Sequence, residues 1–154
     1  MGKLFDEFRE GETFDTPGRT ITEADVIGFA GLTGDYNPVH TDEVYARQTE
    51  FGGRIAHGPM IIGLAFGLAS RLDLIDGTVV ALLSVSWDFH APVRAGDTLY
   101  AAIRVIEKRE TRKPGRGVLG LEFKVRNQRS EDVQTGRARL LMRRQHLEVR
   151  PTGG

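Results

Sequence analysis

Cysteine is absent from this sequence of 154 residues. A chain without cysteine has no disulfide framework, no thiolate nucleophile and no thiolate ligand for a metal ion. Long apolar runs are absent as well. The first 12 residues contain no stretch of signal-peptide type, and the apolar run at residues 60–69 is shorter than the about 20 residues that a membrane-spanning helix needs. These absences predict a cytoplasmic protein with no membrane partner.

Net charge is the third absence, because 21 Lys and Arg residues balance 21 Asp and Glu residues. The sequence also has no basic clusters interleaved with aromatic residues, so it lacks the footprint of a nucleic-acid-binding protein. We therefore expect no nucleic acid among its partners. The charge is uneven, however, since residues 104–154 hold 14 basic and 6 acidic side chains. That excess suits a substrate with phosphate groups, although arginines on the solvent face of strands are the simpler explanation.

The length of the chain corresponds to one domain, because about 150 residues can bury most of their apolar surface around a single core. We expect that domain to cover residues 1–150. The last four residues, 151–154, read Pro-Thr-Gly-Gly. We expect them to form a disordered tail.

A first helix is predicted after residue 22. Thr22 followed by Asp25 is typical of a helix N-terminus, with a hydroxyl cap and an acidic residue in the first turn. The helix should run to about Thr33 and end at Gly34, which can adopt the left-handed cap conformation. Asp35 then lies just beyond the helix end.

The next segment reads Asn37-Pro38-Val39-His40. Proline favours an extended conformation for the residue before it, so the chain should turn here and bring His40 back toward Asp35. Thr41 is expected to cap a second short helix over residues 42–48.

A third helix is predicted from Pro59, where the missing amide hydrogen of proline costs no hydrogen bond. Residues 60–69 carry no charged or polar side chain, which indicates a helix buried on every side. Gly63 and Gly67 are unfavourable for a helix unless another element packs closely against them. We expect a sheet, or a sister helix, on that face.

After residue 77 the apolar residues alternate, as in strands with one buried face. Four strands are predicted, at about residues 79–89, 99–105, 119–125 and 138–142. A shorter strand is expected within residues 12–21, interrupted by Pro17 and Gly18. Short turns between successive strands indicate antiparallel pairing. The prediction is an α+β domain with an antiparallel sheet of about five strands packed on the apolar helix.

Several of these residues form a recognisable string. Residues 29–40 read Phe-Ala-x-x-Thr-Gly-Asp-x-Asn-Pro-x-His, and Phe51, His57-Gly58 and the apolar helix follow. Residues 89–93 read Phe-His-Ala-Pro-Val, and residues 96–99 read Gly-Asp-Thr-Leu. From Ile21 to Thr98 the chain resembles the MaoC-like dehydratase, or R-specific enoyl-CoA hydratase, family. The resemblance implies a hot-dog fold, in which the sheet wraps around a central helix, and a homodimer or higher homo-oligomer that joins two sheets.

The resemblance also implies a reaction, the reversible hydration of trans-2-enoyl-CoA to (R)-3-hydroxyacyl-CoA in fatty acid metabolism. Such a lyase activates water with an Asp and His pair, here Asp35 and His40. We assign Asp35 as the base that orients the water, and His40 as its second ligand and the proton donor. The two roles are exchangeable because coupled groups titrate as a pair. Coenzyme A, or an acyl carrier protein, would enter as part of the substrate, and no separate cofactor is expected.

Four further residues receive roles from the same resemblance. The backbone amide of Gly58 would stabilise the oxyanion at a helix N-terminus. Asn37, as part of the motif, and His57 would lie at the substrate, although His57 equally fits a histidine that orients the loop. Some family members have a serine on the central helix, where this chain has residues 63–67, Gly-Leu-Ala-Phe-Gly. Phe66, if it points into the acyl tunnel, would favour short or medium acyl chains.

Other interpretations remain open at this stage. Asp35, His40 and His57 have the composition of a metal site, but their spacing matches no standard zinc pattern, and we expect no metal. A hot-dog thioesterase would instead need a carboxylate placed to attack the thioester carbonyl. A non-catalytic module that binds acyl-CoA would retain the motif without using it. His90 and His146 are interpreted as ordinary strand and tail residues.

Overall fold

The computed structural model describes residues 1–145. The predicted tail at residues 151–154 and His146 therefore lie outside the described residues. The helices are the short η1 (Phe5–Glu7), α1 (Glu23–Thr33), α2 (Pro38–Thr41), α3 (Glu43–Arg47) and α4 (Gly58–Ser70). The strands are β1 (Thr13–Asp15), β2 (Arg19–Thr20), β3 (Val79–Phe89), β4 (Thr98–Glu110), β5 (Arg116–Arg126) and β6 (Asp132–Arg143). Within residues 1–145 no helix is long and apolar enough to cross a membrane.

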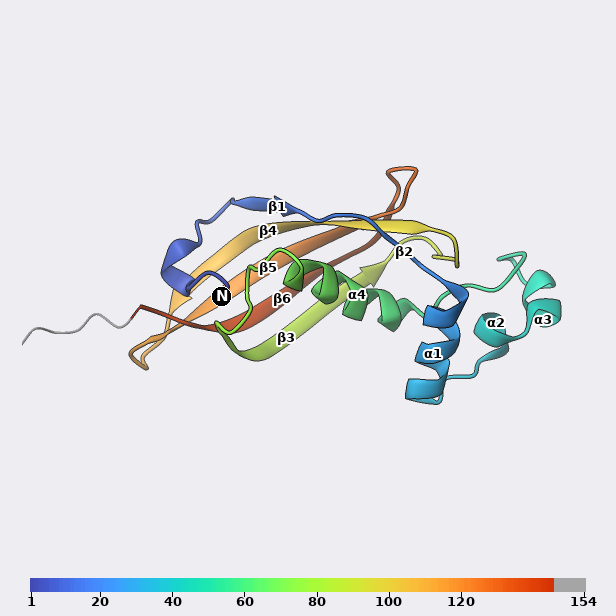
Figure 1. The fold of residues 1–154 in the computed structure, drawn as a ribbon, viewed down its shortest axis with the longest axis horizontal. Coiled ribbons are helices and arrows are strands. Elements are labelled where there is room, and N and C mark those ends of the chain that lie inside the picture. The colour runs from blue at the N-terminus through green and yellow to red at the C-terminus, as the bar shows by residue number, and fades with distance from the viewer. Residues whose placement is uncertain (146–154) are drawn as a thin grey trace, which may run out of the picture.

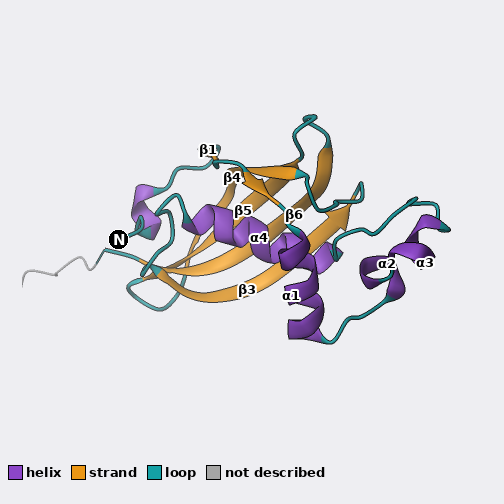
Figure 2. Cartoon of the chain, turned by 45° about the vertical axis from the view of Figure 1, so that its right-hand side comes forward, coloured by secondary structure: helices purple, strands orange, loops and turns teal. Residues whose placement is uncertain are grey.

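The strands form one antiparallel sheet in the order β1-β4-β5-β6-β3, and β2 pairs with β4. The sheet curves around α4, as the hot-dog fold requires (Figures 1 and 2). The predicted fold class and antiparallel pairing are therefore confirmed.

The predicted pairing of every strand with its successor is wrong at one place. Strand β3 does not pair with β4 but crosses over to pair with β6, at the far side of the sheet. The physical reason is that residues 90–97 do not form a tight hairpin. Instead the carbonyl of Val93 accepts a hydrogen bond of 2.7 Å from the amide of Ala56, which ties this connection to the segment before α4.

Helix α1 begins and ends where the local signals predict. The hydroxyl of Thr22 accepts a hydrogen bond from the amide of Asp25, and the carboxylate of Asp25 accepts one from the amide of Thr22. At the other end Gly34 has φ 77°, in the left-handed region. Both ends are set by residues adjacent in sequence, which is why they could be predicted.

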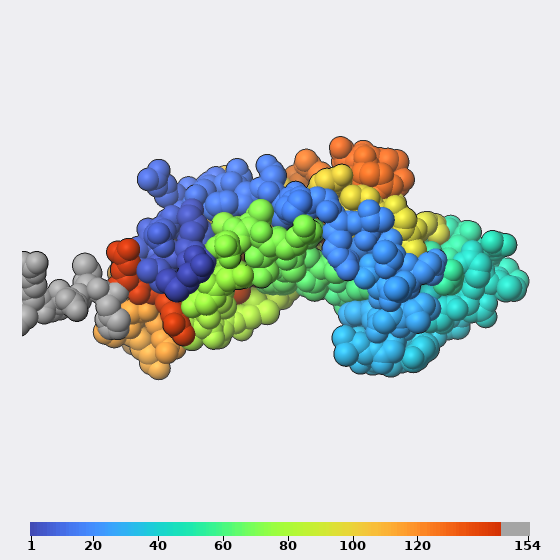
Figure 3. Space-filling model, in the orientation of Figure 1, coloured from blue at the N-terminus to red at the C-terminus, as the bar shows by residue number. Residues whose placement is uncertain are grey.

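The segment after α1 differs from the prediction. Asp42, not Thr41, caps α3, and its carboxylate accepts a hydrogen bond from the amide of Tyr45. Thr41 is instead the last residue of α2, a short helix that was not predicted. Proline is suited to the first turn of a helix, and the side chain of Asn37 caps the turn that Pro38 starts. Together with α1, these two short helices form a lobe that projects beyond one end of the sheet (Figures 1 and 3).

The prediction that α4 is buried on every side is wrong within the described chain. Its buried residues face the sheet, and they are Met60, Ile61, Ala65, Leu68 and Ala69. On the opposite side Gly63 and Gly67 are exposed, and a Cβ added to either would have no atom within 4 Å apart from its chain neighbours and the backbone of its own helix. The close packing expected at these glycines is absent from residues 1–145, because the sheet covers only one side of the helix.

Strand β3 is an edge strand with an irregular register. Register shifts interrupt its pairing with β6 between Val79 and Ala81 and between Leu82 and Ser84. Leu82 and Val85 pair with buried residues of β6 and face the same side as α4, yet they are 52% and 41% exposed. An open apolar surface therefore runs between the edge of β3 and the uncovered side of α4.

Three aromatic rings form the centre of the core. The ring of Phe123 lies 5.1 Å from that of Phe66 on α4 and 5.5 Å from that of Trp87 on β3. Gly136 of β6 stands in register between Trp87 and Phe123. A Cβ on Gly136 would lie 1.8 Å from the indole of Trp87, so glycine is required for this ring to pack across the sheet.

We expect Gly136→Ala to lower the free energy of unfolding by about 1–3 kcal/mol, since the added methyl forces the indole out of the core. Urea unfolding followed by tryptophan fluorescence measures the loss. Gly28→Ala is the matched control, because Gly28 lies exposed within α1 and a Cβ there meets nothing within 4 Å. That variant should gain about 0.5–1 kcal/mol. Equal stability of Gly136→Ala and the parent would contradict the packing described.

Candidate active site

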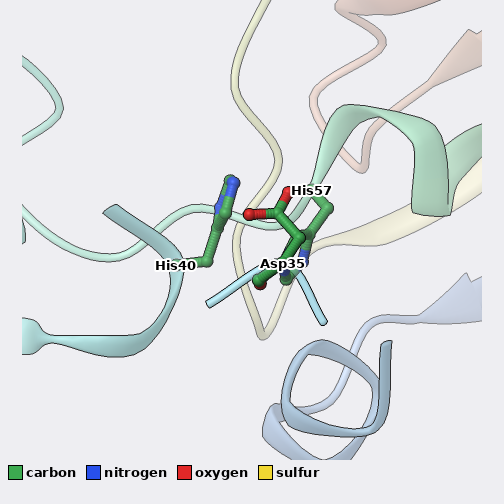
Figure 4. A group of neighbouring side chains, drawn as sticks. All are labelled: Asp35, His40 and His57. Carbon is green, nitrogen blue, oxygen red and sulfur yellow. The ribbon is translucent and has the colours of Figure 1, made fainter. Parts of the chain in front are cut away.

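The turn between α1 and α2 brings Asp35 and His40 together. The amide of Asp35 donates to the hydroxyl of Thr33, and one carboxylate oxygen of Asp35 accepts a hydrogen bond of 3.2 Å from the amide of Asn37. His40 follows on α2, one turn further along the chain. Figure 4 shows the carboxylate of Asp35 turned toward the ring of His40.

His57, at the N-terminus of α4, completes the group. One carboxylate or ring-nitrogen atom from each of Asp35, His40 and His57 lies within 4.8 Å of the other two. Asp35 is exposed, His40 is half-buried and His57 is fully buried. The group therefore runs from the surface of the lobe inward to the start of the central helix.

The hydrogen bond at Nδ1 fixes the tautomer of His40. Nδ1 lies 2.8 Å from the backbone carbonyl of Ile55. A carbonyl can only accept, so Nδ1 carries the proton that is donated. In the neutral ring Nε2 is then the nitrogen with a free lone pair.

His57 holds the other two residues in place. Its Nε2 lies 2.9 Å from the backbone carbonyl of Asp35 and donates to it. Its ring stacks on that of His40, with centroids 3.8 Å apart and planes 28° from parallel, and the ring of Phe29 lies 5.0 Å from it at a tilt of 57°. Its Nδ1 is buried and has no partner in the described chain. These contacts match the role of orienting the loop, one of the two alternatives that the sequence left open.

The three side chains are close enough to suggest a metal ion, but their orientation does not fit one. An imidazole binds a metal through a lone pair in the plane of its ring. Two stacked rings in nearly parallel planes cannot both direct their lone pairs at one ion. The absence of a resident metal stays a prediction, now supported by this geometry.

An apolar cavity of about 350 Å³ lies at the N-terminus of α4. Its lining does not include Asp35, His40 or His57, but it adjoins them through Ile55, which binds His40, and through Gly58, the neighbour of His57. Most of its wall is apolar, and its lining includes Phe51, Ile55, Ile61, Phe89 and Pro92. Gly58 also lines it, and as the first residue of α4 its amide has no partner within the helix. A Cβ on Gly58 would lie 2.8 Å from the ring of Phe89, so only glycine lets this ring reach the helix end.

Sequence reasoning missed two polar residues of the apolar cavity. The buried side chain of Gln134 accepts a hydrogen bond of 2.8 Å from the indole of Trp87 and donates one of 3.2 Å to the carbonyl of Gly58. His90, interpreted as an ordinary strand residue, lines the cavity and its Nε2 lies 2.7 Å from the hydroxyl of Thr135. The available signal for Gln134 was its place in the alternation of β6, on the same face as Ala138, Leu140 and Met142.

Two of the predicted substrate-binding residues, Asn37 and Phe66, do not line the apolar cavity. Phe66 does not line the apolar cavity, because its ring packs against Phe123 and Trp87 on the sheet. The side chain of Asn37 accepts a hydrogen bond from the amide of Val39 and so caps α2. The structure therefore brings Asp35, His40 and His57 together, and Gly58 follows His57 at the start of α4. The side chain of Asn37 instead caps α2, and that of Phe66 packs in the core.

A polar pocket of about 240 Å³ lies on the other side of Ile55, with His40, Glu43, Arg54 and Arg94 in its wall. The guanidinium of Arg54 donates to Glu43 at 2.8 Å and also pairs with Glu23 at 2.9 Å. The hydrogen bond from Arg54 lowers the pKa of the Glu43 carboxyl, and the same bond raises the pKa of Arg54. Both groups are thus charged at neutral pH, and they clamp α1, α3 and the segment before α4 together.

Several proteins of known name are similar to this chain. It is 38% identical over 112 residues to the protein MaoC of Klebsiella aerogenes, covering 72% of this chain and 32% of that protein. Identity to a 3-hydroxybutyryl-CoA dehydratase of Methylorubrum extorquens is 42% over 90 residues, covering 58% of this chain and 55% of the relative. The chain thus spans about a third and about half of these two relatives. An (R)-specific enoyl-CoA hydratase of Rhodospirillum rubrum is 40% identical over 102 residues, covering 66% and 68% of the two chains.

Solved structures agree with these similarities. A MaoC-like dehydratase from Rhodospirillum rubrum superposes with a TM-score of 0.82 at 26% identity, over 95% of this chain and all of the other. A Mycobacterium tuberculosis protein with a double hot-dog fold has a TM-score of 0.84 at 24% identity, over 97% of this chain and 46% of the other, and shows the fold alone. The family model of the MaoC-like domain matches residues 7–127. The fold and the motif around Asp35 and His40 agree with this match. The chain therefore belongs to the MaoC-like domain family.

Proposed function

We propose that this protein is a hydro-lyase that adds water reversibly to trans-2-enoyl thioesters and forms (R)-3-hydroxyacyl thioesters. The observation that carries the proposal is the convergence of Asp35 and His40 beside the apolar cavity at the N-terminus of α4. The named hydratases and dehydratases among the relatives support the same reaction class.

The reaction joins the water oxygen to C3 of the substrate and delivers one proton to C2. Since the carbonyl of Ile55 holds Nδ1–H of His40, Nε2 is the nitrogen that exchanges protons with water and substrate. In our assignment Asp35 takes a proton from the water while a protonated Nε2 gives one to C2. Proton transfer between the two side chains then restores the starting state. The exchanged assignment, with His40 as the base, uses the same atoms.

The thioester oxygen becomes negative as water adds, and a preorganised donor there lowers the barrier. We assign this role to the amide of Gly58, which stands at the positive end of the α4 dipole. The acyl group would lie along the apolar cavity. The carrier, coenzyme A or an acyl carrier protein, would extend outward, and we propose no further cofactor.

Asp35→Asn and His40→Gln should each lower kcat by about 10²–10⁴-fold, the usual contribution of a positioned acid or base. Loss of enoyl absorbance with crotonyl-CoA, and with longer, branched and dicarboxylic enoyl-CoA thioesters, measures the rate. Asp73→Asn is the matched control. Asp73 is exposed beyond the end of α4, and its φ of 56° suits asparagine.

Two outcomes would replace the proposal. Release of free CoA without hydroxyacyl-CoA would indicate the alternative of a thioesterase. Binding of acyl-CoA that Asp35→Asn leaves unchanged, with no turnover of any thioester by the parent, would indicate a non-catalytic binding module.

We also propose that two copies associate through the surface between β3 and α4. An exposed strand edge offers unpaired backbone groups to another strand, and apolar Leu82, Val85 and Phe89 lie exposed along this one. Gly63 and Gly67 would let the helix of a second copy approach closely. Antiparallel pairing of two β3 edges would join the two sheets into one.

Val85→Lys should convert the homodimer, or a larger assembly, to monomers, because it places a charge in that apolar surface. Sedimentation velocity measures the change. Val44→Lys is the control, since Val44 is 73% exposed on α3, away from the β3 edge. A parent protein that sediments as a monomer would refute this interface.

A further inference from the structure

The guanidinium of Arg94 lies inside a loop formed by residues 51–54. It donates to the backbone carbonyl of Phe51 and, at 3.4 Å, to that of Arg54. Between them Gly53 passes so close that a Cβ there would lie 3.3 Å from the same guanidinium. The loop is thus folded around the side chain of Arg94.

Arg94 has no carboxylate partner in the described part of the chain. None of the ion pairs within residues 1–145 includes it, although its side chain is half-buried. A buried cation must be compensated by hydrogen bonds, and here backbone carbonyls supply them. Its own backbone is held as well, because its amide donates at 2.8 Å to the carboxylate of Asp97, which is itself buried.

Arg54, in the same loop, makes contacts of a different kind from those of Arg94. Its side chain points away from the loop to Glu43 and Glu23, on helices of the lobe. Arg54 therefore attaches the loop to its surroundings, whereas Arg94 determines the internal shape of the loop by drawing two of its carbonyls together.

The loop leads directly to the carbonyl that binds His40. The amide of Ile55 donates at 3.2 Å to the carbonyl of Val39, and the carbonyl of Ile55 accepts at 2.8 Å from Nδ1 of His40. The next residue, Ala56, is bonded to Val93, the neighbour of Arg94. Ile55 thus joins the segment that carries His40 to the segment that carries Arg94.

We infer that Arg94 is a positioning residue for His40. By holding the 51–54 loop it keeps the Ile55 carbonyl aimed at Nδ1, which leaves Nε2 available for proton exchange beside Asp35. Without the guanidinium the two carbonyls of the loop lose their donor, the Ile55 carbonyl moves and both tautomers of His40 become populated. The inference rests on the proposed function for its effect on turnover, but its effect on the tautomer does not.

Arg94→Met tests it, because methionine keeps an apolar stem and removes every donor. At a pH at which the His40 ring is neutral, nitrogen-15 NMR should show Nδ1 of His40 protonated in the parent and a mixture of tautomers in the variant. kcat for the enoyl thioester should fall by about 10–10²-fold, as expected for a misplaced reacting group, with KM changed less than about threefold. Arg94→Lys, with a donor that reaches one carbonyl, should recover part of the loss.

Arg137→Met is the matched control, since Arg137 is exposed on β6 and, among residues 1–145, its side chain pairs with the carboxylate of Glu122 and no other. It should keep the parental kcat and tautomer. Parental values of both in Arg94→Met would overturn the inference. If Arg94→Met does not fold, a parental kcat together with a parental His40 tautomer in Arg94→Lys overturns the inference instead. A parent without hydration activity, but with the expected loss of tautomer preference in Arg94→Met, would refute the proposed function and leave the positioning role standing.

Discussion

The hydrogen bond between the ring of His40 and the carbonyl of Ile55 is the contact on which the arrangement of the site depends. It joins the projecting lobe to the segment before the central helix. It also selects the tautomer of the neutral imidazole in which Nδ1 carries the proton. His57 adds to this by bonding the backbone of Asp35 while stacking on His40. Asp35 and His40 are therefore both oriented through backbone carbonyls, one that receives a hydrogen bond from His57 and one that accepts from His40.

Small residues create the spaces that the aromatic core and the apolar cavity need. Gly136 admits the indole of Trp87, and Gly58 admits the ring of Phe89. Gln134 connects these two places, because its amide bonds both the indole and the carbonyl of Gly58. The start of the central helix is thus fixed to the first residues of β6 by a side-chain hydrogen bond as well as by packing.

The features that the sequence predicted correctly are local. The caps of α1 depend on residues three or four positions apart, and the strands on alternation along one segment. The pairing of β3 with β6, the open side of α4 and the contacts of Arg94 and Gln134 depend on residues far apart in the chain. Composition alone made α4 look buried on all sides, because it records that Gly63 and Gly67 are apolar but not what lies opposite them. The Asp35 and His40 pair was found through its motif, while the cap at Asp42 was missed because Thr41 is an equally good capping residue.

Phe89 belongs to two parts of the molecule at once. Its ring lies close to the Cα of Gly58 at the start of α4 and forms part of the cavity wall, yet Phe89 is 55% exposed at the end of the open edge strand. A substitution that suited one of these surroundings would disturb the other. Side chains tolerated at position 89 must therefore fit both the cavity wall and the exposed strand edge. The acyl pocket cannot be redesigned at this position without changing the outer surface as well.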